Sequence, residues 1–273
     1  FDWDKECYAS DYFDQLYEWA IVLIKKNKAY IDSQTSEQIA SQKGTPTQPG
    51  ENSTFRDRPM EESLSIFKGM YSGEYGQGEH VLRAKIDMTS PNMLMRDPVV
   101  YRVMKASHHR TGETWNIYPM YDWTHGESDY IEQVSHSLCT LEFEPHRELY
   151  DWFLDAISPL KGIRPKQREF SRLNLSFTIT SKRKLAQLVE KKIVSGWDDP
   201  RMPTISGLRK RGYTPEALKN FAETVGVSKR ENVIDASLLE FCVRSHLNEI
   251  APRAMVVINP LKIKIINYNN KVV

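Results

Sequence analysis

Residues 169–185 read EFSRLNLSFTITSKRKL, an extended apolar stretch followed by a cluster of cations. The part near 169–178 predicts a strand, and the part from Ser181 on predicts the start of a helix. Between Tyr121 and this stretch, predicted strands alternate with predicted helices. Such alternation indicates an α/β fold with a parallel sheet. Beyond Ser181 the chain is predicted to be mostly helical.

Helix starts elsewhere are marked by residues that favour the first turn. We predict helices after Ser10, from Thr35, from about Pro59, from Thr214 and from Ser228. Thr35 and Ser228 are each followed three residues later by Gln or Glu, which is the spacing of a capping box. Thr214 is followed by a proline, which is favoured at the first helical position.

Several stretches of the chain have the pattern of a strand, and one stretch has the composition of a turn. Leu82, Ala84 and Ile86 alternate with polar residues that include Arg83, which predicts a strand with one apolar and one polar face. Further strands are predicted at 99–105, at 114–120 and, as the start of another β domain, at 255–268. Residues 44–50 are rich in Pro and Gly and predict an exposed loop or hairpin tip. The first 120 residues therefore predict an α+β module.

Composition limits the class of protein. The 273 residues are 40% hydrophobic and 27% charged, which is ordinary for a globular protein. The longest apolar run, residues 20–24, is far shorter than the roughly 20 residues of a membrane span. Three widely spaced cysteines, an odd number, favour a reducing compartment, and we expect the cytoplasm. The chain starts at Phe1 without a leader, so we expect a truncated N-terminus.

Charge is distributed unevenly along the chain. Residues 121–160 hold nine acidic and one basic residue, whereas residues 161–211 hold fourteen basic and four acidic ones. An ordinary charged surface is one interpretation. A site for a polyanion beside a small polar substrate is the other.

Two stretches have the chemistry of a substrate site. In residues 179–185, main-chain N–H groups at a helix start, Ser181 and three cations would bind phosphates, although a solvated basic face fits too. In residues 118–125, we expect a strand to run into a loop at the carboxyl edge of the parallel sheet, where α/β folds bind ligands. Tyr121 and His125 there could bind a neutral amide, and a core aromatic cluster is the alternative.

Two further stretches predict structure rather than chemistry. His136 and Cys139 have the spacing of half a zinc site, but no second pair with cysteine exists, so we expect no metal. Residues 196–205, with two prolines, a Trp and a carboxylate pair, predict a rigid corner.

Taken together and in order, these stretches resemble the glutaminyl branch of the class I aminoacyl-tRNA synthetases. The matching stretches are residues 118–125, 137–143, 170–175, 181–185, 196–207 and 251–254. The likeness covers about residues 10–268, and runs such as 197–207 are too specific to arise by chance. The resemblance implies an α/β protein with four parts. These are an acceptor-stem-binding insertion (1–120), the second half of a Rossmann fold (121–171), a helical subdomain (172–250) and the start of a β-barrel (251–273).

The resemblance also implies site residues. Lys182 matches the second lysine of the mobile Lys-Met-Ser-Lys-Ser type loop, and Ser181 and Lys182 are the catalytic candidates. The expected ATP contacts are Arg172, Leu173, Ser181 and Lys182. The expected glutamine contacts are Tyr121, His125, Cys139, Phe143 and Gln167. The expected tRNA contacts are Pro46, at the hairpin tip, and Pro91, at the minor groove. ATP, Mg²⁺, glutamine and the tRNA acceptor stem are the expected partners of a monomer without membrane contact.

The sequence departs from the family in places. Thr180 replaces the usual methionine of the mobile loop, Pro145 stands where some members carry an acidic residue, and Pro46 stands where a leucine can wedge against the first base pair. The His-x-Gly-His type signature is expected upstream of Phe1. We therefore expect this chain alone not to form the aminoacyl-adenylate.

The implied reaction is the ATP-dependent ligation of glutamine to its tRNA through glutaminyl-adenylate. Archaeal and eukaryotic glutamyl enzymes, the nearest alternative, carry an arginine where this sequence has Cys139. A neutral amide would leave a buried guanidinium unpaired at a cost of about 2–5 kcal/mol, so Cys139 favours glutamine. A non-catalytic tRNA-binding relative is the second alternative, and the intact Ser181-Lys182 pair argues against it.

Overall fold

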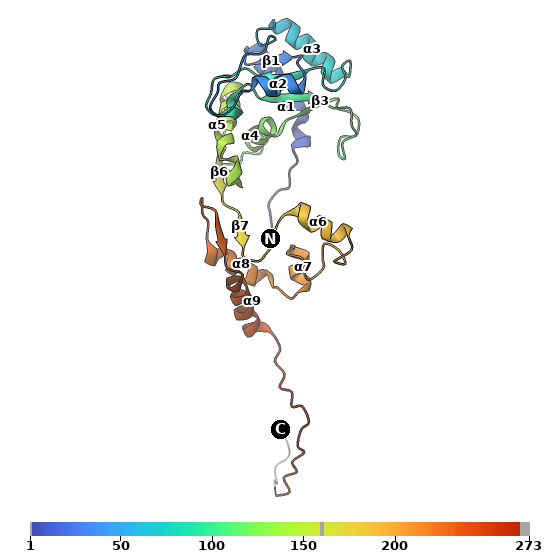
Figure 1. The fold of residues 1–273 in the computed structure, drawn as a ribbon, viewed down its shortest axis with the longest axis vertical. Coiled ribbons are helices and arrows are strands. Elements are labelled where there is room, and N and C mark those ends of the chain that lie inside the picture. Colours follow the sequence, from blue (N-terminus) through green and yellow to red (C-terminus); the bar gives the residue numbers. More distant parts are fainter. Residues whose placement is uncertain (1, 159–160, 268–273) are drawn as a thin grey trace. The chain divides into compact units, whose positions relative to one another are not determined.

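The first part of the chain is built on a four-stranded antiparallel sheet (Figure 1). The computed structural model describes residues 2–158 and 161–267, and the chain falls into two units, Phe1–Arg172 and Leu173–Val273. In the first unit the strand order is β1-β2-β3-β4. The strands are β1 (Ala29–Asp32), β2 (Val81–Ala84), β3 (Val99–Val103) and β4 (Ile117–Pro119).

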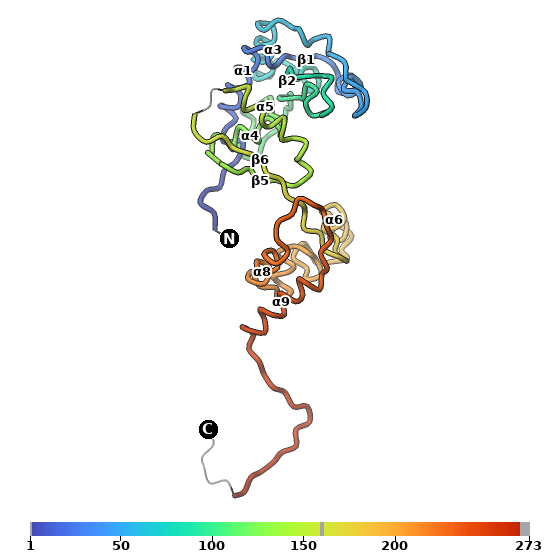
Figure 2. The backbone as a smooth tube through the Cα atoms, turned by 90° about the vertical axis from the view of Figure 1, so that its left-hand side faces the viewer, coloured from blue at the N-terminus to red at the C-terminus, as the bar shows by residue number. Residues whose placement is uncertain are grey.

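Two helices lie next to this sheet (Figure 2), and their apolar side chains belong to its core. A short 3-10 helix, η1 (Ala9–Tyr12), leads into α1 (Phe13–Lys25), and α3 (Met60–Ser72) packs against α1. The ring of Tyr17 stacks on that of Phe67 with centroids 5.0 Å apart. Leu16, Leu23 and Phe67 are completely buried. The helical spacing in the sequence is confirmed, and burial of these side chains is the main force that holds the layer together.

Capping chemistry predicts most, but not all, helix starts. Thr35 and Gln38 form the expected capping box at α2 (Ser36–Gln42), and Thr214 caps α8 (Pro215–Val225) by accepting from the Ala217 N–H. The helix predicted from Ser228 is wrong. The Ser228 hydroxyl accepts from the Arg230 N–H in a local turn, and the chain continues into a strand.

A parallel strand pair follows in the first unit and confirms the predicted α/β pattern. β5 (His136–Thr140) pairs with β6 (Lys166–Phe170). Three helical elements flank the pair, namely α4 (Tyr121–Ile131), η3 (Leu141–His146) and α5 (Arg147–Ile157). The strand-to-loop prediction at 118–125 is wrong, because β4 belongs to the antiparallel sheet and Tyr121 begins a helix.

The second unit is mostly helical, as expected. A second parallel pair joins β7 (Leu173–Leu175) and β8 (Asn232–Ile234). The helices here are α6 (Lys182–Glu190), α7 (Ile205–Lys210), α8 and α9 (Ala236–Ile250). The single strand predicted near 169–178 is two strands, because β6 ends at Phe170 and β7 at Leu175.

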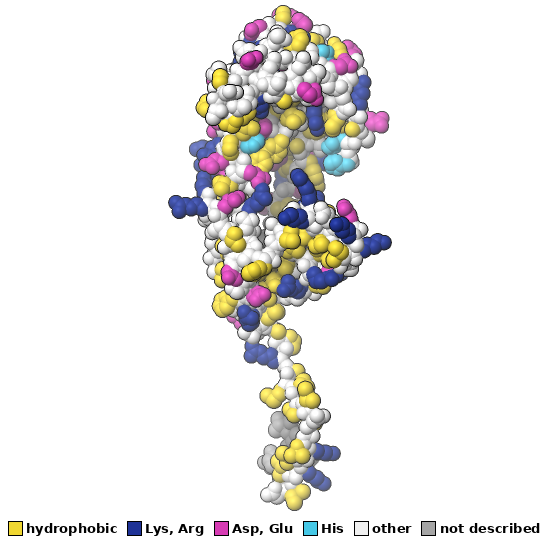
Figure 3. Space-filling model, viewed as in Figure 1, with side chains coloured by type: hydrophobic (Ala, Val, Ile, Leu, Met, Phe, Trp, Pro, Cys, Tyr) yellow, Lys and Arg dark blue, Asp and Glu magenta, His cyan; other side chains and the backbone are white. Residues whose placement is uncertain are grey.

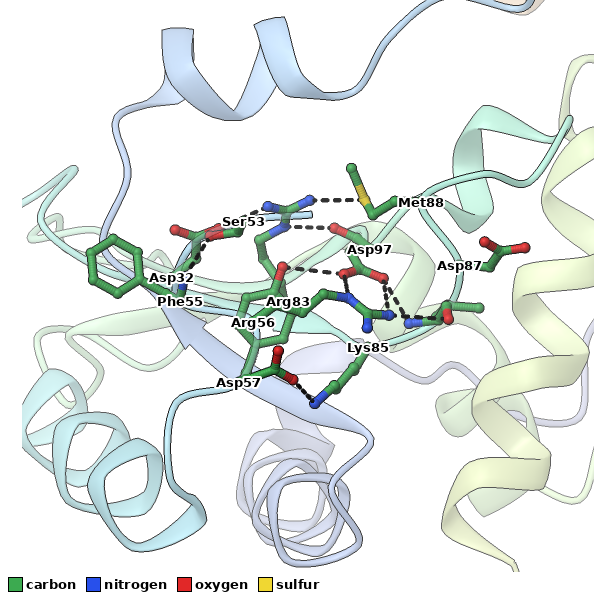
Figure 4. A network of polar contacts seen from close by, with 12 residues as sticks. Asp32, Ser53, Phe55, Arg56, Asp57, Arg83, Lys85, Asp87, Met88 and Asp97 are labelled. Atoms are coloured by element: carbon green, nitrogen blue, oxygen red, sulfur yellow. Dashed lines mark hydrogen bonds and ion pairs between the residues drawn. The ribbon is translucent and has the colours of Figure 1, made fainter. Parts of the chain in front are cut away.

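The antiparallel sheet buries charged side chains that the sequence pattern placed outside (Figure 4). Arg83 is 1% exposed, so the predicted polar face of β2 is wrong. Its Nη1 donates to Asp32 Oδ2 at 2.7 Å, and its Nε donates to the Asp97 carbonyl at 2.7 Å. Arg56 Nε pairs with Asp97 Oδ2 at 2.7 Å. A buried charge is tolerated here because it is fully paired.

The C-terminal tail does not form the predicted strands. From Pro252 to Asn267 the described chain has only bends and irregular structure. Its apolar side chains are exposed, as Figure 3 shows for this segment, with Met255 at 95% and Ile266 at 88%. An alternating sequence needs a partner strand before it can form a ladder. The remainder of the predicted barrel start, 268–273, lies outside the described residues.

None of the helices in residues 2–158 and 161–267 combines the length and the apolar composition of a bilayer-crossing segment. Cys7, Cys139 and Cys242 are free thiols, as the odd cysteine count predicted.

Candidate functional site

The first turn of α4 carries two of the predicted substrate residues. Tyr121 and His125 are four residues apart and therefore share one helix face. The Tyr121 hydroxyl lies 3.4 Å from His125 Nδ1, and the two ring centroids are 5.2 Å apart. Tyr121 remains half exposed, so one side of its ring and hydroxyl is open to a ligand. The core-cluster alternative therefore does not describe Tyr121.

The parallel strands and η3 bring the other predicted glutamine contacts to the same place. Phe143 packs its ring 5.1 Å from that of Tyr121. Gln167, on β6, donates from Nε2 to the Phe143 carbonyl at 2.8 Å. Cys139 lies on the same face of β5 as Ser137, whose hydroxyl is 2.8 Å from His125 Nε2. All five predicted residues therefore lie around one site in the first unit.

The lining of this site carries no net charge near neutral pH. Burial lowers the pKa of His125, which keeps its imidazole neutral. Burial also raises the pKa of Tyr121 and of the Cys139 thiol, so both remain protonated. A site of this kind accommodates an uncharged polar side chain better than an ionised one.

Residues that the sequence did not single out hold His125 in place. Its Nε2 lies 2.8 Å from the Ser137 hydroxyl and 3.4 Å from Asp129 Oδ2. The Tyr150 hydroxyl donates to the same Asp129 oxygen at 3.1 Å. Ser137 lies within a quoted stretch. Asp129 follows His125 by four residues, a helical spacing that could have indicated it, whereas Tyr150 is 21 residues from Asp129 and meets it only through the packing of α4 on α5.

Next to Gln167, a buried carboxylate forms an ion pair with a partly exposed arginine. Glu169 has no exposed surface, and its carboxylate accepts two hydrogen bonds from Arg147 and one from Gln167 Nε2 at 2.9 Å. The hydrogen bond from Arg147 lowers the pKa of Glu169 to about 2. Because Glu169 accepts from Nε2, the Gln167 amide is held in a fixed orientation.

The two predicted tRNA contacts lie on neighbouring exposed turns of the first unit. Pro46 is in the hairpin predicted at 44–50, where Thr45 and Gln48 form an antiparallel bridge. Pro91 is exposed in the loop that joins β2 to the short 3-10 helix at residues 93–95. The Asn92 amide next to it donates to the Pro145 carbonyl at 2.9 Å and to Glu148 Oε2 at 2.9 Å. The Pro91 loop is therefore held against η3, which contains Pro145, and against the start of α5.

The predicted ATP contacts have distinct environments within their own units. In the first unit, Arg172 pairs with Glu142. In the second unit, Leu173 begins β7 and is 42% exposed. Ser181 is the N-cap residue of α6, but its hydroxyl makes no capping hydrogen bond, and Lys182 is the first helical residue. The hydroxyl and the ammonium group are both exposed at a helix N-terminus, where phosphate oxygens bind readily.

The corner predicted at 196–205 is confirmed as a structural element. The Asp199 carboxylate is buried and accepts from Arg201, from the Ser195 N–H at 2.9 Å and from the Arg201 N–H at 2.9 Å. The hydrogen bond from the Arg201 side chain contributes most to keeping the pKa of Asp199 well below its usual range. Throughout the described ranges, no group of three or more His, Cys, Asp or Glu side chains is arranged to hold a metal ion.

Comparison with known proteins identifies the relatives of this chain. Residues 1–249 match the family model described as tRNA synthetases class I (E and Q), catalytic domain. The chain belongs to this family. The resemblance noted from the sequence motifs is therefore confirmed.

Several relatives of this class I family are more than half identical to the chain. Proteins named glutamine–tRNA ligase are 57% identical in Pseudomonas syringae pv. tomato, over 98% of this chain and 47% of the relative. Those of Vibrio cholerae and Pasteurella multocida are 58% identical, over 98% and 99% of this chain and 48% of each relative. The chain thus spans about half the length of the curated relatives that it matches.

Solved structures support the class I fold. A glutamate tRNA ligase from Elizabethkingia meningosepticum superimposes with a TM-score of 0.57 at 17% identity, over 91% of this chain and 56% of that one. Glutamate-tRNA synthetase from Elizabethkingia anophelis gives 0.57 at 18% identity, over 89% and 55%. At these identities the likeness concerns the fold alone. The four-part domain assignment made from the sequence stays a prediction.

Proposed function

We propose that the protein containing this chain uses ATP to join glutamine to its tRNA. The observation that carries the proposal is the uncharged site of Tyr121, His125, Cys139, Phe143 and Gln167, in a chain whose relatives are named glutamine–tRNA ligases. Glutamine and glutamate have nearly the same shape, so a selective enzyme must distinguish an amide from a carboxylate. Three features of the site favour the amide.

The first feature is the tautomer of His125. Asp129 can only accept hydrogen bonds, and it lies next to Nε2, so the imidazole proton belongs on Nε2. Nδ1 is then an acceptor, and the Tyr121 hydroxyl donates to it. The remaining lone pairs of the Tyr121 oxygen are acceptors directed at the ligand. An amide NH₂ can donate to them, whereas a carboxylate would be repelled.

The second feature is the lack of a cation at Cys139. Burial keeps this thiol neutral, so it offers no counter-charge to a glutamate side chain. Arg147 does not supply one either, because its guanidinium is paired with Glu169. The third feature is Gln167, whose side-chain oxygen is buried and accepts no hydrogen bond within the described residues. A buried acceptor of this kind favours a donor nearby.

The proposed ATP step uses the start of α6. Ser181 and Lys182, with the first N–H groups of the helix, would bind the phosphates and stabilise the charge that builds on departing pyrophosphate. The described carboxylates Asp198 and Asp199 are paired with Lys210 and Arg201. Mg²⁺ would therefore be held mainly by phosphate oxygens, as is common for this ion. The tRNA 3′-terminal hydroxyl would then attack the activated carbonyl of the adenylate, forming an ester with glutamine as the bond to AMP breaks and AMP leaves.

The tRNA acceptor stem is the proposed partner of the Pro46 and Pro91 loops. The excess of basic residues in 161–211 would add attraction to the phosphate backbone. We place the protein in the cytoplasm as a monomer, in line with its three free thiols.

Substitution of Tyr121 tests the proposal. In the full-length protein, Tyr121→Phe should lower kcat/KM for glutamine about 10- to 100-fold in tRNA aminoacylation, because a buried polar contact to the amide is lost. Tyr130→Phe is the matched control, since it removes a hydroxyl from the same helix whose hydrogen bonds, among the described residues, go to the main chain of Lys161. Unchanged glutamine kinetics in Tyr121→Phe would contradict the assignment of the pocket.

A further inference from the structure

One buried arginine joins the two exposed loops assigned to tRNA. Arg96 is 2% exposed. Its Nη1 donates to the carbonyls of Lys43 at 2.8 Å, Thr45 at 2.9 Å and Gln48 at 2.9 Å, and its Nε donates to the carbonyl of Ser90 at 2.7 Å. The Thr45 and Gln48 carbonyls belong to the turn that carries Pro46, the Lys43 carbonyl immediately precedes that turn, and the Ser90 carbonyl immediately precedes Pro91.

The turn at 44–50 has few other means of keeping its shape. Its two prolines have no N–H to donate. Within the turn, the described hydrogen bonds are the reciprocal main-chain pair between Thr45 and Gln48 and two contacts of the Thr45 hydroxyl, with the Gln48 N–H at 3.1 Å and the Thr47 hydroxyl at 3.3 Å. The Gly50 N–H donates to the Met88 carbonyl at 2.8 Å, which joins the turn to the loop that carries Pro91. A charged guanidinium makes stronger hydrogen bonds to carbonyls than a neutral donor does. Arg96 is thus the main side-chain support of the turn.

The backbone next to Arg96 is itself held in an uncommon conformation. Asp97 has a φ of 39°, in the left-handed region that side chains other than glycine rarely adopt. Its Oδ1 accepts from the Ile86 N–H at 2.7 Å, and Oδ2 pairs with Arg56, as Figure 4 shows. This anchoring directs the Arg96 side chain away from the sheet network and toward the two loops. Local strain that the surroundings enforce is frequent at functional sites.

We propose that Arg96 is a positioning residue, which fixes the spacing between the Pro46 turn and the Pro91 loop so that both engage one RNA duplex together. The inference rests on the proposed function, which supplies the tRNA acceptor stem as the duplex. Arg96 itself is buried and touches no RNA. Its loss should therefore weaken tRNA binding through misplaced loops and should not remove a phosphate contact.

Kinetics of the full-length protein separate positioning from a general loss of structure. Arg96→Lys should raise the KM and Kd for tRNA about tenfold, because one ammonium cannot reach all four carbonyls. The KM for glutamine should stay within about twofold, and the salt dependence of tRNA binding should be unchanged, because no phosphate contact is lost. Arg58→Lys is the matched control, since Arg58 also bonds to main chain in this layer, at the Ile31 carbonyl, but touches neither loop.

A double-mutant cycle tests whether Arg96 acts through the turn. Arg96→Lys combined with Pro46→Gly should be clearly less than additive in tRNA affinity, because both changes loosen the same turn. Gly50→Ala gives an independent disturbance, since its Cβ would lie 2.8 Å from the Gln42 carbonyl, and it should reproduce the tRNA defect.

The outcomes distinguish the two proposals. An Arg96→Lys enzyme with unchanged tRNA KM, or strict additivity with Pro46→Gly, would overturn the positioning role and leave the proposed function intact. A wild-type protein that neither binds nor aminoacylates tRNA would overturn the proposed function itself.

Discussion

The antiparallel sheet and the parallel strand pairs differ in how completely they are covered. Around β1–β4, Leu82, Val100 and Ile117 have no exposed surface. On the parallel pairs, Leu138 of β5 is 67% exposed and Val233 of β8 is 68% exposed. Parallel sheets are normally covered on both faces. The antiparallel layer is therefore the stable scaffold, and the residues with substrate chemistry lie beside the less covered strands.

Stability and ligand binding depend on different residues of the molecule. Residues that hold the scaffold are buried in it, whereas Tyr121 and Lys182 are exposed at helix starts. Sites that bind ligands are often drawn from the less protected parts of a protein. Substitutions in the two regions should therefore differ in what they change.

The largest contrast should come from removing an apolar side chain in each region. Phe67→Ala should destabilise the first unit by about 3–5 kcal/mol, because it leaves a cavity in a completely buried site. Leu138→Ala should change the free energy of unfolding by less than about 0.5 kcal/mol. Urea unfolding followed by tryptophan fluorescence measures both. Similar losses in the two variants would mean that β5 is as well covered as the sheet.

A comparable loss should follow from breaking the buried ion pair of the sheet. Arg83→Met should cost about 3 kcal/mol or more, because it leaves Asp32 buried without its cation. The double substitution Arg83→Met with Asp32→Leu should recover most of that loss in the same urea experiment. A double variant that is less stable than the single one would show that the charges themselves are needed.

Two buried glutamates should give opposite pH dependences. Hydrogen bonding to Arg147 lowers the pKa of Glu169 to about 2, so its stabilisation is present above the ordinary carboxyl pKa and is lost as pH falls toward 2. Burial raises the pKa of Glu127 well above the usual value, and neither of its carboxyl oxygens has a hydrogen-bond partner among the described residues. Its folded form holds the proton longer than the unfolded form, so stability falls as pH rises above the ordinary value.

Removal of each charge tests these signs. Glu169→Gln should cost about 1–2 kcal/mol at pH 7, after allowance for solvent at the part-exposed Arg147, and progressively less as the pH falls below 4 toward 2. Glu127→Gln should be more stable than wild type at pH 8, with the advantage fading as the pH is lowered. Thermal unfolding from pH 3 to pH 9 measures both. A Glu127→Gln advantage that grows in acid would contradict the assignment.

The smallest contrast concerns two helix caps of the second unit. Thr214→Ala should cost about 1 kcal/mol, because the threonine accepts from the Ala217 N–H. Ser181→Ala should cost less than about 0.5 kcal/mol, because its hydroxyl makes no capping bond. In the full-length protein, however, Ser181→Ala should reduce ATP use. A stability loss equal to that of Thr214→Ala would show that Ser181 is a structural cap.

Local signals in the sequence predicted local structure well. Thr35 with Gln38 and Thr214 with Pro215 predict helix starts because the capping partners are close in sequence. Arg83 could not be placed, because its partners, Asp32 and Asp97, are distant in sequence and only the folded sheet brings them together. The four-residue β1 was missed for a similar reason, since all of its side chains are buried and no alternation marks it.

The candidate site was predicted mainly through the family likeness. Spacing alone put Tyr121 and His125 in a loop, whereas they share a helix face that presents both to the pocket. The capping signal at Ser228 failed, because a serine followed by a hydrogen-bonded turn competes with helix initiation. The alternation in 255–267 failed to give strands because a ladder also requires a partner.

The choice between glutamine and glutamate can be measured directly by placing a cation at Cys139. The measurement is kcat/KM for glutamine and for glutamate in tRNA aminoacylation by the full-length protein, its Cys139→Arg variant and a Leu138→Arg control, in which the neighbouring side chain points to the opposite face of β5. We expect wild type to prefer glutamine by about 10³-fold or more. We also expect Cys139→Arg to lose about 10²-fold in glutamine use and Leu138→Arg to retain it. Equal use of the two amino acids by wild type, or undiminished glutamine use by Cys139→Arg, would contradict this expectation.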